Sequence, residues 1–196
     1  MYEREFERLV VGTRGEVVVG ERVRQLRQSI GLSVRTLATR TGFSPSFISQ
    51  VEHGLASPSI ASLERIATEL GISLVEFFDV ASPVDSATVR SGGEPHLISS
   101  WSRAELRALG PIGPEHALEP VMITLEPGGR SGKHPAAHAG EEFAIVFEGE
   151  VTLTLGDRDH HLRRGDSATF SSATPHRWEN SGTVPARIVV VAHRAI

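Results

Sequence analysis

Apolar residues between positions 20 and 78 recur at intervals of three and four, the spacing that places side chains on one face of an α-helix. Ser33, Ser44 and Ser59 stand where such helices would begin, and Pro45 follows Ser44 at a first helical position. Glycines stand where the helices would end. The segment therefore predicts five short helices with very short connections. The apolar positions that carry the pattern are Val23, Leu26, Ile30, Leu37, Ala38, Ile48, Val51, Leu63, Ile66, Ala67 and Leu70.

The pattern changes after residue 95. Short runs rich in β-branched and aromatic residues alternate with Gly- and Pro-containing turns, which predicts an antiparallel sandwich or barrel. Residues 81–95 are rich in Ser, Gly and Pro and predict a linker. We therefore expect a two-domain α+β protein with an arm or short helix over 1–19, a helical domain over 20–80, the linker, and an all-β domain over 96–196. The predicted strands lie at 121–125, 142–147, 151–155, 167–170 and 186–192.

Composition restricts the kinds of site that the chain can build. Of its 196 residues 39% are apolar and none is cysteine, which excludes disulfides and thiolate metal sites. No apolar stretch is long enough for a signal peptide or a membrane span, so we expect a soluble cytoplasmic protein. The net charge is −4, but residues 20–80 hold six Arg and six acidic residues. The acid excess lies outside the helical domain, so the charge does not exclude DNA binding there.

Residues 20–78 resemble the Cro and phage-repressor (Xre-type) helix-turn-helix family over their full length. Ala38 is small where the two helices of the motif approach, and Gly42 falls at the turn between them. Ile48 and Val51 have the spacing that packs the second helix on the first. The resemblance implies a lambda-repressor-like five-helix bundle and a transcription regulator that binds double-stranded DNA.

By this resemblance the recognition helix runs from Pro45 to about His53 and enters the major groove with its N-terminus first. Gln50 could pair with an adenine edge. Phe47 could contact a thymine methyl or pack on the neighbouring helix. Arg35 and Arg40 could contact phosphates, and solvated surface positions are the alternative. The candidate DNA-binding residues are Ser33, Val34, Arg35, Ser44, Ser46, Phe47, Ser49 and Gln50.

The family resemblance also implies a structural pair. An Arg on the first helix commonly pairs with a Glu on the recognition helix, and these positions are Arg27 and Glu52. We interpret the two as a partly buried ion pair that fixes helix orientation, with direct DNA contact as the alternative.

Residues 128–150 and 165–180 resemble the two sequence motifs of the cupin family. Gly128, His134, Glu142 and Gly149 fit the spacing of the first motif, and Ala136 stands where its second histidine is usual. Gly165, His176 and Asn180 fit the second motif, whereas Ser171 and Ala173 replace its Pro and Gly. The resemblance implies a cupin (double-stranded β-helix, jelly-roll) barrel over roughly residues 115–196.

In such a barrel His138, Glu142 and His176 could form a two-histidine, one-carboxylate site for Fe, Mn, Zn or Ni, with His134 as a candidate fourth ligand. The alternative is a small-molecule effector pocket without metal, which uses the same side chains as hydrogen-bond partners. Arg130, Phe170 and Trp178 are candidates for lining that pocket, and Trp178 could instead simply close the barrel.

Two functions follow from these resemblances. The first is a regulator that senses a small-molecule effector and binds DNA as a homodimer, because one helix-turn-helix reads only one half-site. The second is a mononuclear non-haem iron enzyme, because the same His-x3-Glu…His arrangement resembles the hydroxypropylphosphonate epoxidases. The intact recognition helix and the absence of a clear phosphonate-binding cluster favour the regulator, and we expect no enzymatic activity.

Overall fold

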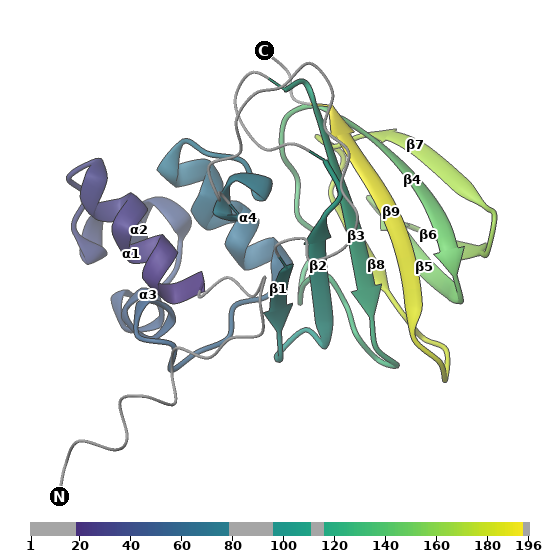
Figure 1. Ribbon diagram of the computed structural model, residues 1–196, viewed down its shortest axis with the longest axis horizontal. Coiled ribbons are helices and arrows are strands. Elements are labelled where there is room, and N and C mark those ends of the chain that lie inside the picture. Colours follow the sequence, from purple (N-terminus) through teal and green to yellow (C-terminus); the bar gives the residue numbers. More distant parts are fainter. Residues whose placement is uncertain (1–18, 79–95, 111–115, 194–196) are drawn as a thin grey trace, which may run out of the picture.

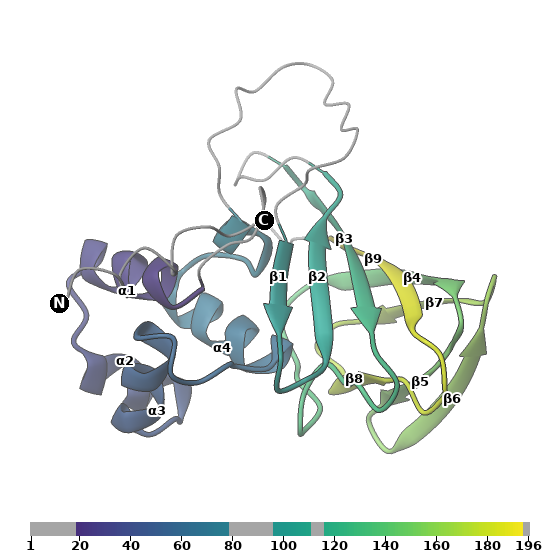
Figure 2. The same cartoon turned by 60° about the horizontal axis from the view of Figure 1, so that its bottom comes forward.

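The computed structural model describes residues 19–78, 96–110 and 116–193. The expected N-terminal arm (1–19) and linker (81–95) lie, except for residue 19, outside the described residues. Helices gather at one end of the molecule and strands at the other, and α4 is the helix beside strand β1 (Figure 1). A view turned by 60° shows the same arrangement, with β1 and β2 next to the helices (Figure 2). We call α1 to η2 the helical module and β1 to β9 the β module.

The helical module contains four α-helices and a short 3-10 helix within the described residues. They are α1 (Val19–Ser29), α2 (Val34–Thr41), α3 (Pro45–Glu52), α4 (Ile60–Leu70) and η2 (Val75–Phe78). Ser33, Ser44 and Ser59 cap α2, α3 and α4 by accepting a hydrogen bond from a backbone N–H three residues later. These capping serines are the ones that predicted the helix starts.

The prediction of five α-helices was wrong. The fifth segment, Val75–Phe78, is a four-residue 3-10 helix. Gly71 ends α4 in a left-handed conformation, and the Oγ of Ser73 accepts a hydrogen bond from the N–H of Glu76 at the start of the next turn. Val75 and Phe77 are buried, so this short turn still contributes two side chains to the core of the module.

Within the part of the chain that the structure describes, the β module contains two antiparallel sheets. The six-stranded sheet has the order β1-β2-β3-β9-β4-β7, and the three-stranded sheet has the order β6-β5-β8. The strands are β1 (His96–Ser99), β2 (Ala104–Ala108), β3 (Leu118–Leu125), β4 (Glu141–Glu148), β5 (Glu150–Leu155), β6 (Arg158–Arg163), β7 (Ser167–Ser171), β8 (His176–Glu179) and β9 (Ala186–His193). All five predicted runs are strands, whereas β1, β2, β6 and β8 were not predicted.

Asn180, which fits the second cupin motif, has a structural role in the β module. Its fully buried side chain donates hydrogen bonds from Nδ2 to the carbonyls of Leu125 (2.9 Å) and Val184 (2.8 Å). Its Oδ1 accepts a hydrogen bond from the N–H of Gly182 at 2.9 Å. The amide thus ties the end of β3 to the loop between β8 and β9, which a hydrophobic side chain could not do.

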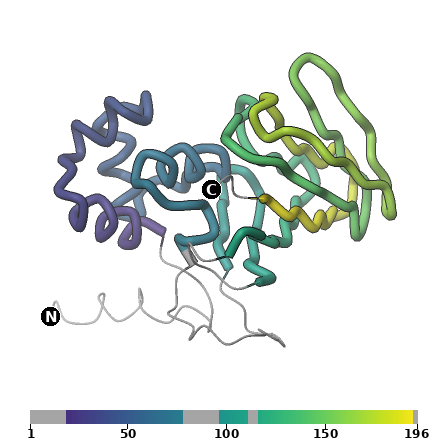
Figure 3. Tube along the Cα trace, turned by 90° about the horizontal axis from the view of Figure 1, so that it is seen from above, coloured from purple at the N-terminus to yellow at the C-terminus, as the bar shows by residue number. Residues whose placement is uncertain are grey.

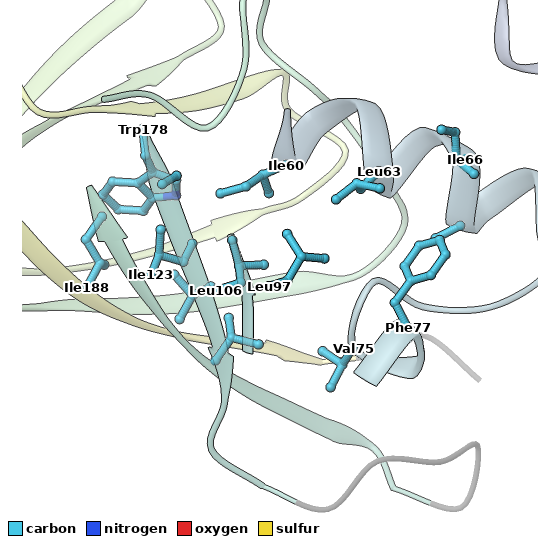
Figure 4. Close-up of a cluster of buried hydrophobic side chains, with 14 of the residues drawn as sticks. Ile60, Leu63, Ile66, Val75, Phe77, Leu97, Leu106, Ile123, Trp178 and Ile188 are labelled. Atoms are coloured by element: carbon cyan, nitrogen blue, oxygen red, sulfur yellow. The ribbon is translucent and has the colours of Figure 1, made fainter. Parts of the chain in front are cut away.

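The two modules pack on one another through the N-terminal end of α4. The N–H of Ala61 donates to the carbonyl of Ser131 (3.0 Å), and Ser99 Oγ donates to the carbonyl of Pro58 (2.7 Å). Gly132 comes so close to the helix that an added Cβ would lie 2.6 Å from the Cβ of Ala61. Buried apolar side chains of α4, η2 and the strands form one group there (Figure 4).

The trace seen from above shows the modules side by side, with α4 between the other helices and the strands (Figure 3). Among the described residues no helix is long and apolar enough to cross a membrane.

Candidate functional site

The turn between α2 and α3 has the geometry of a helix-turn-helix motif. Gly42 takes a left-handed φ of 70°, and the N–H groups that follow α2 donate to carbonyls of its last turn. Ser44 Oγ then accepts from the N–H of Phe47 at 3.1 Å, and α3 begins at Pro45, three residues after the turn glycine. The connection between α2 and α3 is therefore short, and α3 starts with a capped first turn, as in a helix-turn-helix motif.

The predicted DNA-contacting residues do not all have the same exposure. Ser46 and Gln50 of α3 are exposed, and so are Ser33, Arg35 and Ser44. Ser49 and Val34 are half-buried. Phe47 is also half-buried, and its ring centroid lies 4.9 Å from that of Phe43. Its side chain therefore packs within the helical module and remains partly exposed at the surface.

Arg27 and Glu52 form a buried two-point ion pair between α1 and α3. Arg27 Nε lies 2.6 Å from Glu52 Oε1, and its Nη2 lies 2.9 Å from Oε2. Nη1 also donates to the carbonyl of Leu32 at 2.6 Å. The hydrogen bond to Glu52 raises the pKa of Arg27, against the opposing effect of burial. With Glu52 buried, the pair acts as a structural tie rather than a DNA contact.

Three side chains of the β module converge in the way the cupin resemblance implied. His138 lies in the loop before β4, Glu142 is on β4, and His176 is the first residue of β8. Their ligand atoms all lie within 4.8 Å of one another. Glu142 Oε1 is 2.7 Å from His138 Nε2 and 3.5 Å from His176 Nε2. We call these three residues the triad.

The backbone orients both imidazoles of the triad. Nδ1 of His138 lies 3.1 Å from the carbonyl of Ala139, and Nδ1 of His176 lies 3.0 Å from that of Thr174. A carbonyl only accepts hydrogen bonds, so each Nδ1 carries a proton and each Nε2 points toward Glu142. Nε2 of His138 is buried and, despite the nearby carboxylates, has no partner in hydrogen-bond geometry. Two Nε2 atoms and one carboxylate suit a divalent transition metal.

Glu64 of α4 also reaches the triad, which the sequence analysis did not anticipate. Its Oε1 lies 3.0 Å from His138 Nε2. Burial raises the pKa of Glu64 to about 7, an effect that the charge of His138 partly opposes and that of Glu142 increases. Burial lowers the pKa of His138, but Glu142 and Glu64 outweigh this and raise it to about 9. Its Nε2 therefore holds a proton at neutral pH unless a cation takes that place.

The triad opens onto a cavity of about 430 Å³ between the two modules, within the size range of small-molecule sites. We call it the intermodule cavity. Its apolar wall includes Ile60, Leu74 and Val121, and its carboxylates are Glu64, Glu119 and Glu142. No Arg or Lys is among its described lining residues. The site therefore favours a metal ion or a neutral or cationic ligand over an anion.

The other predicted pocket residues, and the candidate fourth metal ligand, do not all lie at the intermodule cavity. Trp178 is buried and lines the intermodule cavity. Phe170 is buried with its ring centroid 5.2 Å from that of His176. Arg130 lies outside the cavity, exposed, with its guanidinium 5.7 Å from the ring of Trp101. His134 is not brought to the triad, because it is exposed and lines a second cavity of about 300 Å³ beside Phe47.

Comparisons with known proteins match both halves of the chain. A helix-turn-helix family model matches residues 23–77, and a cupin domain model matches residues 121–192. The transcriptional regulator PuuR of Escherichia coli is 31% identical over 170 residues, which cover 87% of this chain and 91% of PuuR. The chain belongs to the helix-turn-helix transcriptional regulators that carry a cupin domain.

Other relatives agree with this assignment. The transcriptional regulator SutR of Escherichia coli is 29% identical over 161 residues, which cover 82% of this chain and 85% of SutR. The crystal structure of a transcriptional regulator from Vibrio cholerae has a TM-score of 0.71 and 25% identity, covering 92% of this chain and 97% of that one. The protein is thus a DNA-binding regulator, and these named relatives support a regulator rather than an enzyme.

A hydroxypropylphosphonic acid epoxidase from S. wedmorenis, the enzyme family considered above, is more distant. It has 22% identity and a TM-score of 0.48, covering 92% of this chain and 100% of that one.

Proposed function

We propose that this cytoplasmic regulator binds its operator through α3 and that occupancy of the intermodule cavity changes its affinity for DNA. The observation that carries the proposal is the composition of the cavity wall, which comes from both modules. α4 and η2 supply Ile60, Glu64 and Val75, and the strands supply Glu142 and His176. A ligand held there contacts the module that reads DNA, so its binding energy depends on how the modules are placed.

The proposed DNA surface follows from the exposure of the two motif helices. Gln50 and Ser46 are exposed on α3, where they can reach base edges. Backbone N–H groups at the starts of α2 and α3, near Ser33 and Ser44, are available to phosphates. Arg35 and Arg40 are exposed on α2 and can add charge contacts to the backbone of the duplex.

The proposed assembly is a symmetric homodimer formed through the β module. One helix-turn-helix reads one half-site, and paired half-sites are about 34 Å apart, which requires two copies. Phe143 and Phe147 are 43% and 58% exposed on the outer face of β4, and Ile145 lies half-buried between them. Val189 and Val191 of the adjacent strand β9 pair with Ile145 and Phe143. This apolar surface suits a second copy of the chain.

In the metal-bound form, His138, Glu142 and His176 would hold one divalent ion such as Fe, Mn, Zn or Ni. The ion would supply a Lewis-acidic centre in the wall of the cavity, for an effector with an oxygen or nitrogen donor. A metal-free effector site that uses the same three side chains as hydrogen-bond partners is the alternative.

The experiment compares DNA affinity with and without metal. Protein purified without chelator is analysed for metal, and a DNA fragment is selected from a random pool by the wild-type protein. The proposal predicts stoichiometric metal that is lost in His176→Ala, and an affinity for the fragment that differs between metal-loaded and chelator-treated wild type. Equal affinities in the presence of bound metal would contradict metal sensing, and absence of metal from the protein would favour the metal-free alternative.

A further inference from the structure

Two carboxylates from different modules approach the same nitrogen atom. Glu142 Oε1 of the β module lies 2.7 Å from His138 Nε2, and Glu64 Oε1 of the helical module lies 3.0 Å from it. The Glu64 side chain is only 22% exposed and lines the intermodule cavity. The acceptor groups around Nε2 therefore exceed what one N–H can satisfy with good geometry.

Electrostatics favours a cation at this point. Two carboxylates brought close together in a partly buried site repel one another, and among the described lining residues the imidazole of His138 lies between them whereas no Arg or Lys is present. A divalent ion offsets both charges, and carboxylate oxygen is a common ligand for such ions beside imidazole. Glu64 is thus placed where it can act either on the ion itself or on its bound water.

Glu64 lies on a helix whose first turn is in direct contact with the β module. Ala61, one turn earlier on the same helix, donates its N–H to the carbonyl of Ser131 at 3.0 Å. Gly132 lies against Ala61 with no room for a Cβ between them. The start of α4 is therefore held on the β module, and Glu64, one turn further along the helix, reaches the triad.

The next residue along α4 faces the DNA-reading helices. The guanidinium of Arg65 lies 5.4 Å from the ring centroid of Phe43, in the turn that follows α2. The ring of Phe43 in turn packs against that of Phe47 on α3, tilted by 56° with a centroid distance of 4.9 Å. Glu64 and Arg65 are adjacent on α4, so this helix connects the contact with the triad on one side to the contact with Phe43 and the recognition helix on the other.

We propose that Glu64 is the helical module's contribution to the metal site, so that metal occupancy is transmitted along α4 through Arg65 and Phe43 to the recognition helix. The inference rests on metal binding by the triad, as proposed above. It adds a residue from the DNA-reading module to a site that would otherwise lie wholly in the β module, and it predicts that α4 responds to the metal.

The experiment uses Zn²⁺ alone as the probe and the full-length protein after chelator treatment. Zn²⁺ affinity is measured by calorimetry for wild type, Glu64→Gln and the control Glu69→Gln, which lies on the same helix but does not line the cavity. We expect Glu64→Gln to weaken Zn²⁺ binding about 10-fold or more, as loss of a supporting carboxylate typically does, and Glu69→Gln to leave it unchanged. Thermal unfolding confirms that both variants fold.

Amide hydrogen exchange then measures transmission without knowledge of the operator. In wild type and Glu69→Gln, Zn²⁺ should slow exchange in β4 and also in α4. In Glu64→Gln, at saturating Zn²⁺, the protection of β4 should remain and that of α4 should be lost. Equal affinity and equal protection of α4 in Glu64→Gln would overturn the inference while leaving the triad as a metal site. Failure of wild type to bind Zn²⁺ would overturn both.

Discussion

The guanidinium of Arg27 on α1 donates two hydrogen bonds to the carboxylate of Glu52, the last residue of α3. The N–O distances are 2.6 and 2.9 Å. Their side chains are only 10% and 2% exposed. The pair fixes the orientation of the recognition helix relative to α1, so a change at either residue should act first on the stability of the helical module.

Replacement of Arg27 by Ala should therefore lower the free energy of unfolding by about 3 kcal/mol, because it leaves the Glu52 carboxylate buried without its partner. The double change Arg27→Met with Glu52→Leu should cost much less, since neither charge remains. Urea unfolding of the three proteins measures the difference. If the double variant were as unstable as Arg27→Ala, an unpaired buried charge would not be the cause.

Two glycines of the helical module should differ in their tolerance of Ala. A Cβ on Gly20 would lie 2.2 Å from the carbonyl oxygen of Val51, where α1 crosses α3. A Cβ on Gly42 meets nothing within 4 Å, but its φ of 70° is unfavourable for any other L-residue. We expect Gly42→Ala to cost about 1 to 2 kcal/mol from backbone strain and Gly20→Ala about 3 kcal/mol from the clash.

Chemical denaturation of both glycine variants tests this order of stabilities. Gly54→Ala, at another left-handed position with an open surrounding, serves as a matched control for the strain at Gly42. A Gly20→Ala protein as stable as wild type would show that α1 and α3 can separate at no cost.

The stability of the metal-free protein should fall as pH rises from about 6.5 to 9. His138 faces Glu64 on α4, Glu142 on β4 and His176 on β8, and its pKa is raised from 6.5 to about 9. The folded protein thus holds a proton that the unfolded chain releases, so the stabilisation is fully present below pH 6.5 and is lost as pH passes through 9. Glu64, whose pKa is raised to about 7, changes stability in the same direction between about pH 4.5 and 7.

The pH effect is measured as the free energy of unfolding in urea at several pH values with a chelator present. His138→Gln should have a flatter dependence above pH 6.5 than wild type, because it lacks the titrating group. Parallel curves for the two proteins would mean that His138 does not carry the effect.

The helix-turn-helix could be predicted closely because its signals are local. Ser33, Ser44 and Ser59 each bond to a backbone N–H three residues away, and Gly42 needs its conformation within a single turn. The fifth helix could not be distinguished from a 3-10 turn, because four residues with two buried side chains fit both. The polar strand β6 was missed since it has almost no buried face and so no alternating pattern.

The metal candidates were found by resemblance and spacing, but Glu64 was not. His138, Glu142 and His176 carry the motif, whereas Glu64 is separated from them by more than 70 residues and belongs to the other module. Its place beside His138 depends on how α4 docks on the β module, through contacts such as Ala61 with Ser131. No local pattern in a single sequence encodes that docking.

The central claim is that exposed residues of α3 read the operator, and Gln50→Ala tests it most directly. A fragment selected by the wild-type protein from random DNA is compared with an unrelated duplex at fixed salt concentration. Gln50→Ala should lose about 1 to 3 kcal/mol of affinity for the selected fragment and bind the unrelated duplex as wild type does. Selection of no preferred sequence by the wild type, or an unchanged preference in Gln50→Ala, would contradict the reading of DNA through this residue.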